Sequence, residues 1–359
     1  MSAWPRLSEF LSAHRHAPTL SVYLEAAPAD PAESRAVALR LRTNIEQLRD
    51  AAASWPEAER EQLEACLAEL IEAIPSAEHR SRRQGWAFFR TAAGAQLVID
   101  APAGVETSAA WGIGPRVIPF LRAAEPESAL LVQVDREHAR IGLLHDGVVE
   151  TALEMQADRV GEVGPHMSSG PAPGFHSGTR GRAGADEAQR QRKEATERLL
   201  ATAMRRVATL AEDSLPLVIG GATETVKHFV VALPRTLAER TAVVPTLRMG
   251  APDAALPEIL AALREMRQRE QAAHITALRD AAAARGRAAL GFEGAQRAAE
   301  QGAIAELIFS DVAWQAHPEE VEALVHRALT SGASVEWTAL QPQPESQTDG
   351  IVAGLRFTL

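Results

Sequence analysis

The residue types best suited to catalysis in this chain are two histidines and a serine in one glycine-rich stretch. His166 and His176 could act as a general base or bind a metal, and His176 precedes Ser177, a potential nucleophile. Neither histidine has a Cys, His or acidic partner at a metal-ligand spacing. A His–Ser pair would also need a buried orienting acid and an oxyanion site. We therefore expect no catalytic residue, no metal and no cofactor, and keep catalysis by His176 and Ser177 as the alternative.

The same part of the chain is locally basic. Residues 159–206 contain nine Lys or Arg and five Asp or Glu, a net charge of +4, whereas the whole chain carries −10. Arginine binds phosphate in a bidentate manner and stacks on bases, and glycine lets the backbone approach RNA closely. The alternative is a linker followed by a solvated amphipathic helix. The candidate RNA contacts are Gly174, Phe175, His176, Ser177, Gly178, Thr179, Arg180, Gly181, Arg182, Arg190, Arg192 and Lys193.

Other motifs have simpler explanations. The sequence from Gly178 to Gly181 lacks the Gly-Lys-Ser/Thr of a phosphate-binding loop, so nucleotide hydrolysis is not expected. Gly220-Gly221 before a helix could hold an anion, but a plain turn is the preferred interpretation. Asp135, Glu137 and Asp146 could form a nuclease-like carboxylate cluster, although acidic residues are common in turns.

The single cysteine, Cys66, can form no internal disulfide, which favours a reducing compartment. Its apolar helical spacing with Leu63, Leu67 and Leu70 indicates a small core residue, and a catalytic thiol is the alternative. The sequence predicts neither a signal peptide nor a membrane span, so we expect a cytoplasmic protein with no membrane partner. The acidic balance excludes a whole-molecule basic footprint for nucleic acid, and no DNA partner is expected.

Three elements must position the basic stretch. An apolar strand at 129–134, a strand at 139–144 and an Asp-Gly turn before a strand at 148–153 predict an antiparallel meander. Residues 161–185 hold seven glycines and almost no aliphatic residue, so we expect a long exposed loop. A basic helix is expected from about 186 to 212, and then a short strand at 217–219 and a helix at 223–232.

Flanking segments predict two further α/β domains. Before the meander we expect a strand at 19–25, two helices ending near residue 74, and a hairpin of strands at 85–90 and 95–99. After it we expect a helix, 257–285, and an alternating pattern whose elements lie at 293–301, 304–309, 318–330, 334–337 and 351–357. The prediction is a mixed α/β protein with three separate cores: an N-terminal α/β domain (1–125), a middle domain (126–250) and a C-terminal domain (251–359).

This order of units carries a resemblance. The C-terminal sequences are AALGFEGAQRAAEQGAIAELIFSD (288–311), GASVEWTAL (332–340) and DGIVAGLRF (349–357). They resemble the third domain of the archaeal and eukaryotic release factors and Pelota, an α/β/α sandwich related to kink-turn binding ribosomal proteins. The meander LLVQVDREHARIGLLHDGVVE (130–150), the loop and the basic helix QRQRKEATERLLATAM (189–204) resemble their second domain. The N-terminal unit resembles that of the bacterial members and does not match the codon-reading domain.

The resemblance implies a ribosomal partner. In release factors the middle-domain loop carries Gly-Gly-Gln, which promotes ester hydrolysis, and that tripeptide is absent from this sequence. The chain is in this respect similar to bacterial hibernation factors of the Balon type. We therefore expect a factor that binds the ribosomal A-site region in hibernation or rescue without hydrolysis, with a translational GTPase as a possible further partner. The alternatives are a peptidyl-tRNA hydrolase that uses another loop residue, and a stress-related protein-binding module.

Overall fold

The structure is a computed structural model of the chain, and it describes residues 3–28, 30–74, 81, 84–124, 128–145, 147–158, 180–211, 215–339 and 348–359. The chain divides into two compact units. Unit 1 combines residues 1–125 with residues 268–359, and unit 2 comprises residues 126–267.

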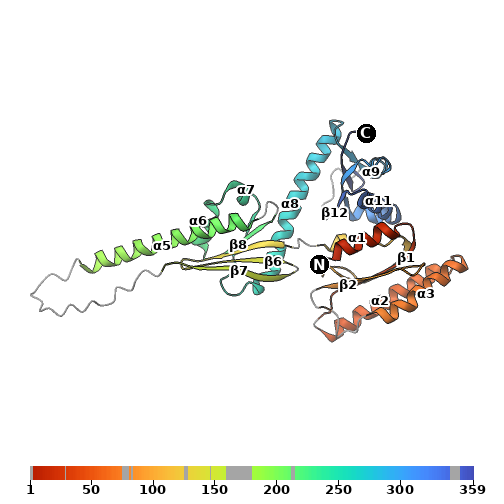
Figure 1. Cartoon of the computed structure of the whole chain (residues 1–359), viewed down its shortest axis with the longest axis horizontal. Helices are drawn as coiled ribbons and strands as arrows, with labels where there is room; N and C mark the ends of the chain where they lie inside the picture. Colours follow the sequence, from red (N-terminus) through yellow and green to blue (C-terminus); the bar gives the residue numbers. More distant parts are fainter. Residues whose placement is uncertain are drawn as a thin grey trace, which may run out of the picture. The chain divides into compact units, whose positions relative to one another are not determined.

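The N-terminal part of unit 1 is built on an antiparallel sheet. Its strand order is β3-β2-β1-β4, and the strands are β1 (Pro18–Leu24), β2 (Gly85–Thr91), β3 (Gln96–Ala101) and β4 (Ser108–Ile113). One face packs on α2 (Pro31–Ala52) and α3 (Glu57–Ala73), drawn in orange in Figure 1. Helix α2 begins where it does because Asp30 accepts a hydrogen bond from the Ala32 amide at 2.8 Å and Pro31 occupies the first turn.

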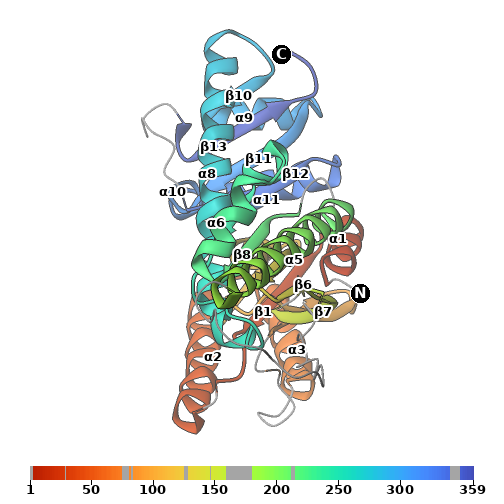
Figure 2. The same cartoon turned by 90° about the vertical axis from the view of Figure 1, so that its left-hand side faces the viewer.

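The C-terminal part of unit 1 has a mixed sheet of order β10-β13-β11-β12, in which only β11 and β12 run parallel. Its strands are β10 (Ala288–Leu290), β11 (Ile304–Ser310), β12 (Ser334–Thr338) and β13 (Ile351–Leu355). One face packs on α8 (Leu256–Ala283) through Ile275 and Leu278, and Figure 2 shows this sheet beside α8. The other face carries α9 (Gly291–Glu300), α10 (Asp311–Ala316) and α11 (Pro318–Thr330). The predicted α/β/α sandwich is therefore confirmed.

The two parts of unit 1 share one hydrophobic core. From the first part, this core contains buried residues of α1 (Ala3–His14), of the second face of the N-terminal sheet and of α4 (Ile118–Ala123). From the second part, it contains buried residues of α9, α11 and the C-terminal sheet. It includes Phe10, Phe89 and Phe120 from the first part, and Phe309 and Leu324 from the second. The expectation of three separate cores is therefore wrong, because side chains far apart in the sequence fill one core.

Unit 2 is built on a five-stranded mixed sheet of order β7-β6-β5-β8-β9. Its strands are β5 (Ser128–Val134), β6 (His138–His145), β7 (Val148–Gln156), β8 (Leu217–Gly221) and β9 (Thr241–Val243). Strands β5, β6 and β7 form the predicted antiparallel meander, and β8 and β9 extend it in parallel with β5.

Helices cover both faces of that sheet. On one face lie α5 (Arg180–Leu210) and α6 (Thr223–Val231), with Phe229 fully buried. The other face packs on the start of α8 through Ile259 and Leu263. The short helices α7 (Arg235–Ala238) and η1 (Asp253–Ala255) lie in the connections.

The sequence predictions hold for most elements, with one boundary corrected. Helix α5 begins at Arg180, so the expectation of a loop through residue 185 is wrong for its last six residues. Residues 161–179 of the expected loop lie outside the described residues. The mixed α/β fold class is confirmed, whereas the division into domains at residues 125 and 250 stays a prediction. Among the described residues, no helix is both long and apolar enough to cross a membrane.

Candidate functional site

The candidate RNA contacts fall into three groups in the structure. Residues 174–179 lie outside the described residues, so the structure does not test the positions of His176 and Ser177. Arg180, Gly181 and Arg182 form the first turn of α5. Arg190, Arg192 and Lys193 are exposed further along the same helix.

Helix α5 is anchored along its second half. Its buried side chains recur at helical spacing from Ala195 onward, through Leu199, Ala203 and Val207, and pack on the sheet. Residues 189–194 are all exposed. Figure 1 shows α5 lying along the sheet of unit 2 and continuing beyond the ends of its strands. The basic residues 190, 192 and 193 therefore lie on a helical segment that contributes nothing to the hydrophobic core.

Acidic neighbours compensate part of this positive charge. Lys193 Nζ lies 3.9 Å from the Glu197 carboxylate, and the Arg198 guanidinium lies 3.8 Å from that of Asp158. All four side chains are at least 60% exposed, so these contacts are screened by water and salt. Such weak pairs can exchange for phosphate contacts.

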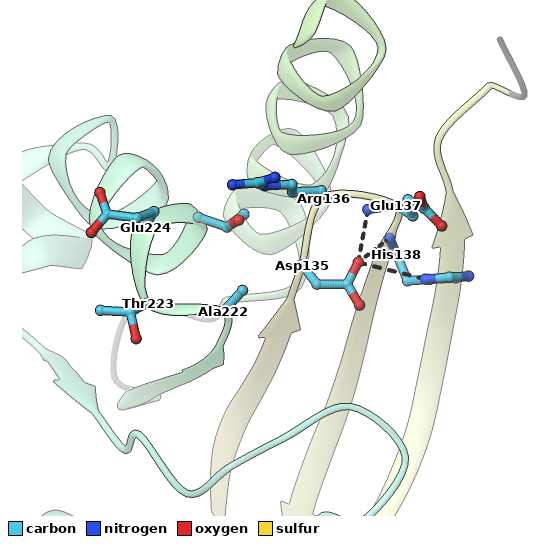
Figure 3. Close-up of a pocket in the computed structure, with 8 residues that line it drawn as sticks. Asp135, Arg136, Glu137, His138, Ala222, Thr223 and Glu224 are labelled. Atoms are coloured by element: carbon cyan, nitrogen blue, oxygen red, sulfur yellow. Dashed lines mark hydrogen bonds and ion pairs between the residues drawn. The ribbon is translucent and has the colours of Figure 1, made fainter. Parts of the chain in front are cut away.

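A pocket lies next to the β5–β6 turn, which contacts α5 through Thr196. Strands β5 and β8 run parallel, and both end where the pocket begins. The β5–β6 turn and the start of α6 line a volume of about 500 Å³, shown in Figure 3. Thr196 of α5 donates a hydrogen bond to the Arg136 carbonyl at 2.9 Å, which ties the helix to this turn. Sequence reasoning missed the pocket, because nothing local in β8 shows that it pairs in parallel with β5.

The β5–β6 turn uses its acidic residue for structure. Asp135 Oδ1 accepts hydrogen bonds from the backbone amides of Glu137 (2.7 Å) and His138 (2.6 Å), as the dashed lines in Figure 3 show. His138 Nδ1 lies 3.5 Å from the same oxygen, and Nε2 lies 3.4 Å from the Gln156 side-chain nitrogen. Asp135 is therefore a turn-forming residue. Asp146, the third member of the carboxylate cluster considered above, lies outside the described residues.

The glycine pair beside the pocket also has a structural role. A Cβ on Gly220 would lie 2.3 Å from the Leu247 carbonyl oxygen, and one on Gly221 would lie 1.9 Å from that of Val134. Gly221 also has a φ of +129°, which side-chain-bearing residues rarely adopt. The pocket lining carries three carboxylates, those of Asp135, Glu137 and Glu224, against Arg136 and His138. This charge balance does not favour an anion site, and the turn interpretation accounts for both glycines.

Cys66 lies in the core, as the sequence predicts. It is 3% exposed among the residues that join α3 to the N-terminal sheet. Burial raises the pKa of its thiol, and the positive charge of Arg90 offsets only part of this increase. A thiol held in its neutral form is a poor nucleophile, so the structure supports a packing role. Among the described residues, no group of three or more His, Cys, Asp or Glu side chains could hold a metal ion.

Comparison with known proteins finds a similarity in the middle of the chain. The model of bacterial archaeo-eukaryotic release factor family 10 matches residues 115–268, which include the meander, the glycine-rich stretch and α5. No curated protein sequence matches the chain.

Solved structures show weak likenesses at low identity. Archaeoglobus fulgidus Pelota is 17% identical, with 77% of this chain and 80% of that chain covered and a TM-score of 0.43. An archaeal translation termination factor, aRF1, is 17% identical, with 98% and 97% covered and a TM-score of 0.26. Dom34 of S. cerevisiae is 14% identical, with 64% and 63% covered and a TM-score of 0.39. The match of residues 115–268 to this release factor family agrees with the resemblance that the sequence indicates.

Proposed function

We propose that this chain is a ribosome-associated translation factor that binds ribosomal RNA near the A site through residues 174–182 and the exposed residues Arg190, Arg192 and Lys193 of α5. It acts in hibernation or rescue and does not hydrolyse peptidyl-tRNA. The observation that carries the proposal is the position of the basic residues: Arg190, Arg192 and Lys193 are exposed on a helical segment that lies ahead of the buried half of α5. The family match over the same residues supports a partner in translation.

Physical chemistry favours RNA as the partner of this segment. Each arginine that reaches a phosphate releases counterions from the RNA, which contributes a favourable, salt-dependent term. The four arginines 180, 182, 190 and 192 lie within four turns of one helix. An overall charge of −10 opposes nonspecific attraction to nucleic acid, so binding must rest on this local segment.

The non-enzymatic part of the proposal rests on the sequence. Gly-Gly-Gln is absent, and the corresponding stretch reads Gly174-Phe175-His176-Ser177-Gly178. A translational GTPase that delivers this chain to the ribosome in the cytoplasm is the further partner that we propose. Among the solved structures, S. cerevisiae Dom34 is described as interacting with Hbs1, and an archaeal Pelota as ribosome-bound with ABCE1.

Ribosome co-sedimentation tests the binding surface. We expect the variant R180A/R182A/R190A/R192A to sediment with ribosomes far less than the parent at near-physiological salt. A matched control, R6A/R42A/R60A/R235A, removes four exposed arginines elsewhere and changes the net charge equally. It should sediment like the parent. Equal loss in both variants would mean that only net charge matters, and no loss in the first would contradict the proposed surface.

Peptide release separates binding from catalysis. Ribosomes that carry peptidyl-tRNA should retain the peptide when the parent protein binds. Release by the parent that is abolished in H176A or S177A would establish the hydrolase alternative instead. Absence of ribosome binding under all salt conditions would favour the protein-binding module.

A further inference from the structure

The two parts of unit 1 are joined by more than apolar packing. Residues 115–123, which we term the docking segment, follow β4 and include α4. Toward β1, the Tyr23 hydroxyl donates to the Arg116 carbonyl at 2.6 Å, and the Arg116 amide donates to Ser21 Oγ at 2.9 Å. The backbone of the docking segment is therefore fixed to the N-terminal sheet on one side.

Helix α11 holds the other side of the same backbone. Glu322 Oε1 accepts hydrogen bonds from the amides of Val117 at 2.6 Å and Ile118 at 3.3 Å. His326 Nε2 lies 2.8 Å from the Pro115 carbonyl oxygen, and Glu319 forms an ion pair with Arg116. The Glu322 carboxylate thus satisfies amides at the start of α4 that have no acceptor within that helix.

Glu322 is an unusual residue for an apolar interface. It is 2% exposed, and its Oε2 atom has no hydrogen-bond partner among the described residues. Burial of a carboxylate carries a desolvation cost that only well-placed donors offset. Its charge also raises the pKa of Tyr23, although burial of the phenol is the largest cause of that shift. Any other placement of α11 on the N-terminal sheet would bury the carboxylate without its donors, so Glu322 specifies one docking geometry.

At its C-terminal end, the docking segment is held in place by the side chain of Arg122. The Arg122 guanidinium lies 4.8 Å from the ring centre of Trp314 and 5.9 Å from that of Trp337. Its Nε atom lies 2.9 Å from Asp311 Oδ1, and the Trp337 indole N–H donates to the same oxygen at 3.0 Å. The cation is therefore held by both electrostatic and cation–π interactions.

Close approach at the start of the segment also requires a specific backbone. Gly114 has a φ of +77°, and a Cβ there would lie 2.6 Å from His326 Cε1 and 2.9 Å from the Arg15 carbonyl oxygen. A side chain at this position would push α11 away from β4. The glycine allows His326 to reach Pro115.

We infer that residues 115–123 are an intramolecular docking segment whose partner is the surface formed by α10, α11 and β12, so that residues 3–124 and 268–359 open and unfold as one cooperative unit. The C-terminal segment is then not an independent domain, although its own sheet has helices on both faces. This inference does not depend on the proposed ribosomal function.

Native-state hydrogen–deuterium exchange on the full chain tests the coupling. In the parent, the slowest amides of the two segments should share one opening free energy as denaturant is raised. In Glu322→Ala, the two segments should separate, with protection in one falling roughly 10- to 100-fold below the other, the range for lost hydrogen bonds to a charged group. Glu320→Ala removes an exposed carboxylate from the same helix and should behave like the parent.

Two results would overturn the inference: separate opening free energies for the two segments in the parent, or the same exchange pattern for the Glu322→Ala and Glu320→Ala variants. If Glu322→Ala does not fold, Arg122→Ala replaces it, because it removes the contacts with Asp311, Trp314 and Trp337 at the other end of the docking segment. The parent measurement alone also decides, since it needs no substitution.

Discussion

Arginines in two regions of this molecule have opposite surroundings. In the docking segment, Arg116 and Arg122 have side chains 13% and 26% exposed, and each pairs with a carboxylate from the C-terminal part of unit 1. In α5, Arg190 and Arg192 are exposed and precede Ala195 and Leu199, whose side chains are buried. The residue type is the same in both regions. Arg116 and Arg122 are largely buried in contacts within the fold, whereas Arg190 and Arg192 lie at the surface of α5.

Replacement of Arg122 should have the largest effect on stability. Arg122→Ala removes the guanidinium beside Trp314 and Trp337 and leaves the Asp311 carboxylate without its cationic partner. We expect a loss of about 2–3 kcal/mol in the free energy of unfolding, since breaking a partly buried ion pair leaves an uncompensated charge. Denaturant unfolding followed by tryptophan fluorescence measures it.

Arg192→Ala is the matched comparison, and its cost should lie within about 0.5 kcal/mol because an exposed surface position is involved. Equal losses in the free energy of unfolding for Arg122→Ala and Arg192→Ala would contradict the difference drawn between the two regions.

Cys66 extends the comparison to chemical reactivity. Because Cys66 is buried and burial raises its pKa, the thiol should react with iodoacetamide on the order of 100-fold more slowly in the folded protein than in denaturant. The folded-state rate should keep rising as pH increases above the ordinary thiol range. Rapid labelling at neutral pH would mean that the thiol is accessible and would reopen a catalytic role.

The smallest effect concerns an exposed arginine with a carboxylate partner. Arg49 donates to Glu64 at 2.8 Å, and this hydrogen bond lowers the pKa of the Glu64 carboxyl. The lowered folded-state pKa means that the stabilisation is present above the unfolded pKa and is lost as pH falls through the folded value. Both side chains are about half exposed, so Glu64→Gln should cost no more than about 0.5 kcal/mol at pH 7.

Thermal unfolding at pH 7 and at acid pH would measure the Glu64 effect, with Glu61→Gln, an exposed position on the same helix, as the control. A loss above about 1 kcal/mol would show that partner geometry outweighs exposure and would weaken the contrast drawn between buried and exposed arginines.

Local sequence signals were sufficient for most elements and insufficient for their assembly. The meander followed from its apolar segments and the Asp-Gly turn, and α11 was expected at 318–330, where the structure has it. Helix α1 was missed because only Leu7, Phe10 and Leu11 are buried, and β4 because its residues are mostly small. The sequence around Glu322 does not distinguish it from a solvent-exposed glutamate. Its role becomes visible only in the structure, where the amides of Val117 and Ile118 donate to its carboxylate.

The candidate RNA surface was predictable from composition, but the packing of α5 that positions this surface was not. The net positive charge of residues 159–206 is visible in the sequence, whereas the position at which α5 leaves its sheet depends on where Ala195 and Leu199 pack. The start of α5 at Arg180 also places Arg180 and Arg182 on the helix, where sequence reasoning placed them in the loop.

The most direct test of the central claim is the salt dependence of ribosome binding. The logarithm of the binding constant should fall linearly with the logarithm of salt concentration for the parent, as phosphate contacts require. In R180A/R182A/R190A/R192A, the slope should be smaller by about 3, because each lost phosphate contact removes about 0.7–0.9. The control R6A/R42A/R60A/R235A should keep the parental slope. Equal slopes for the parent and the first variant would contradict the claim that these arginines contact RNA.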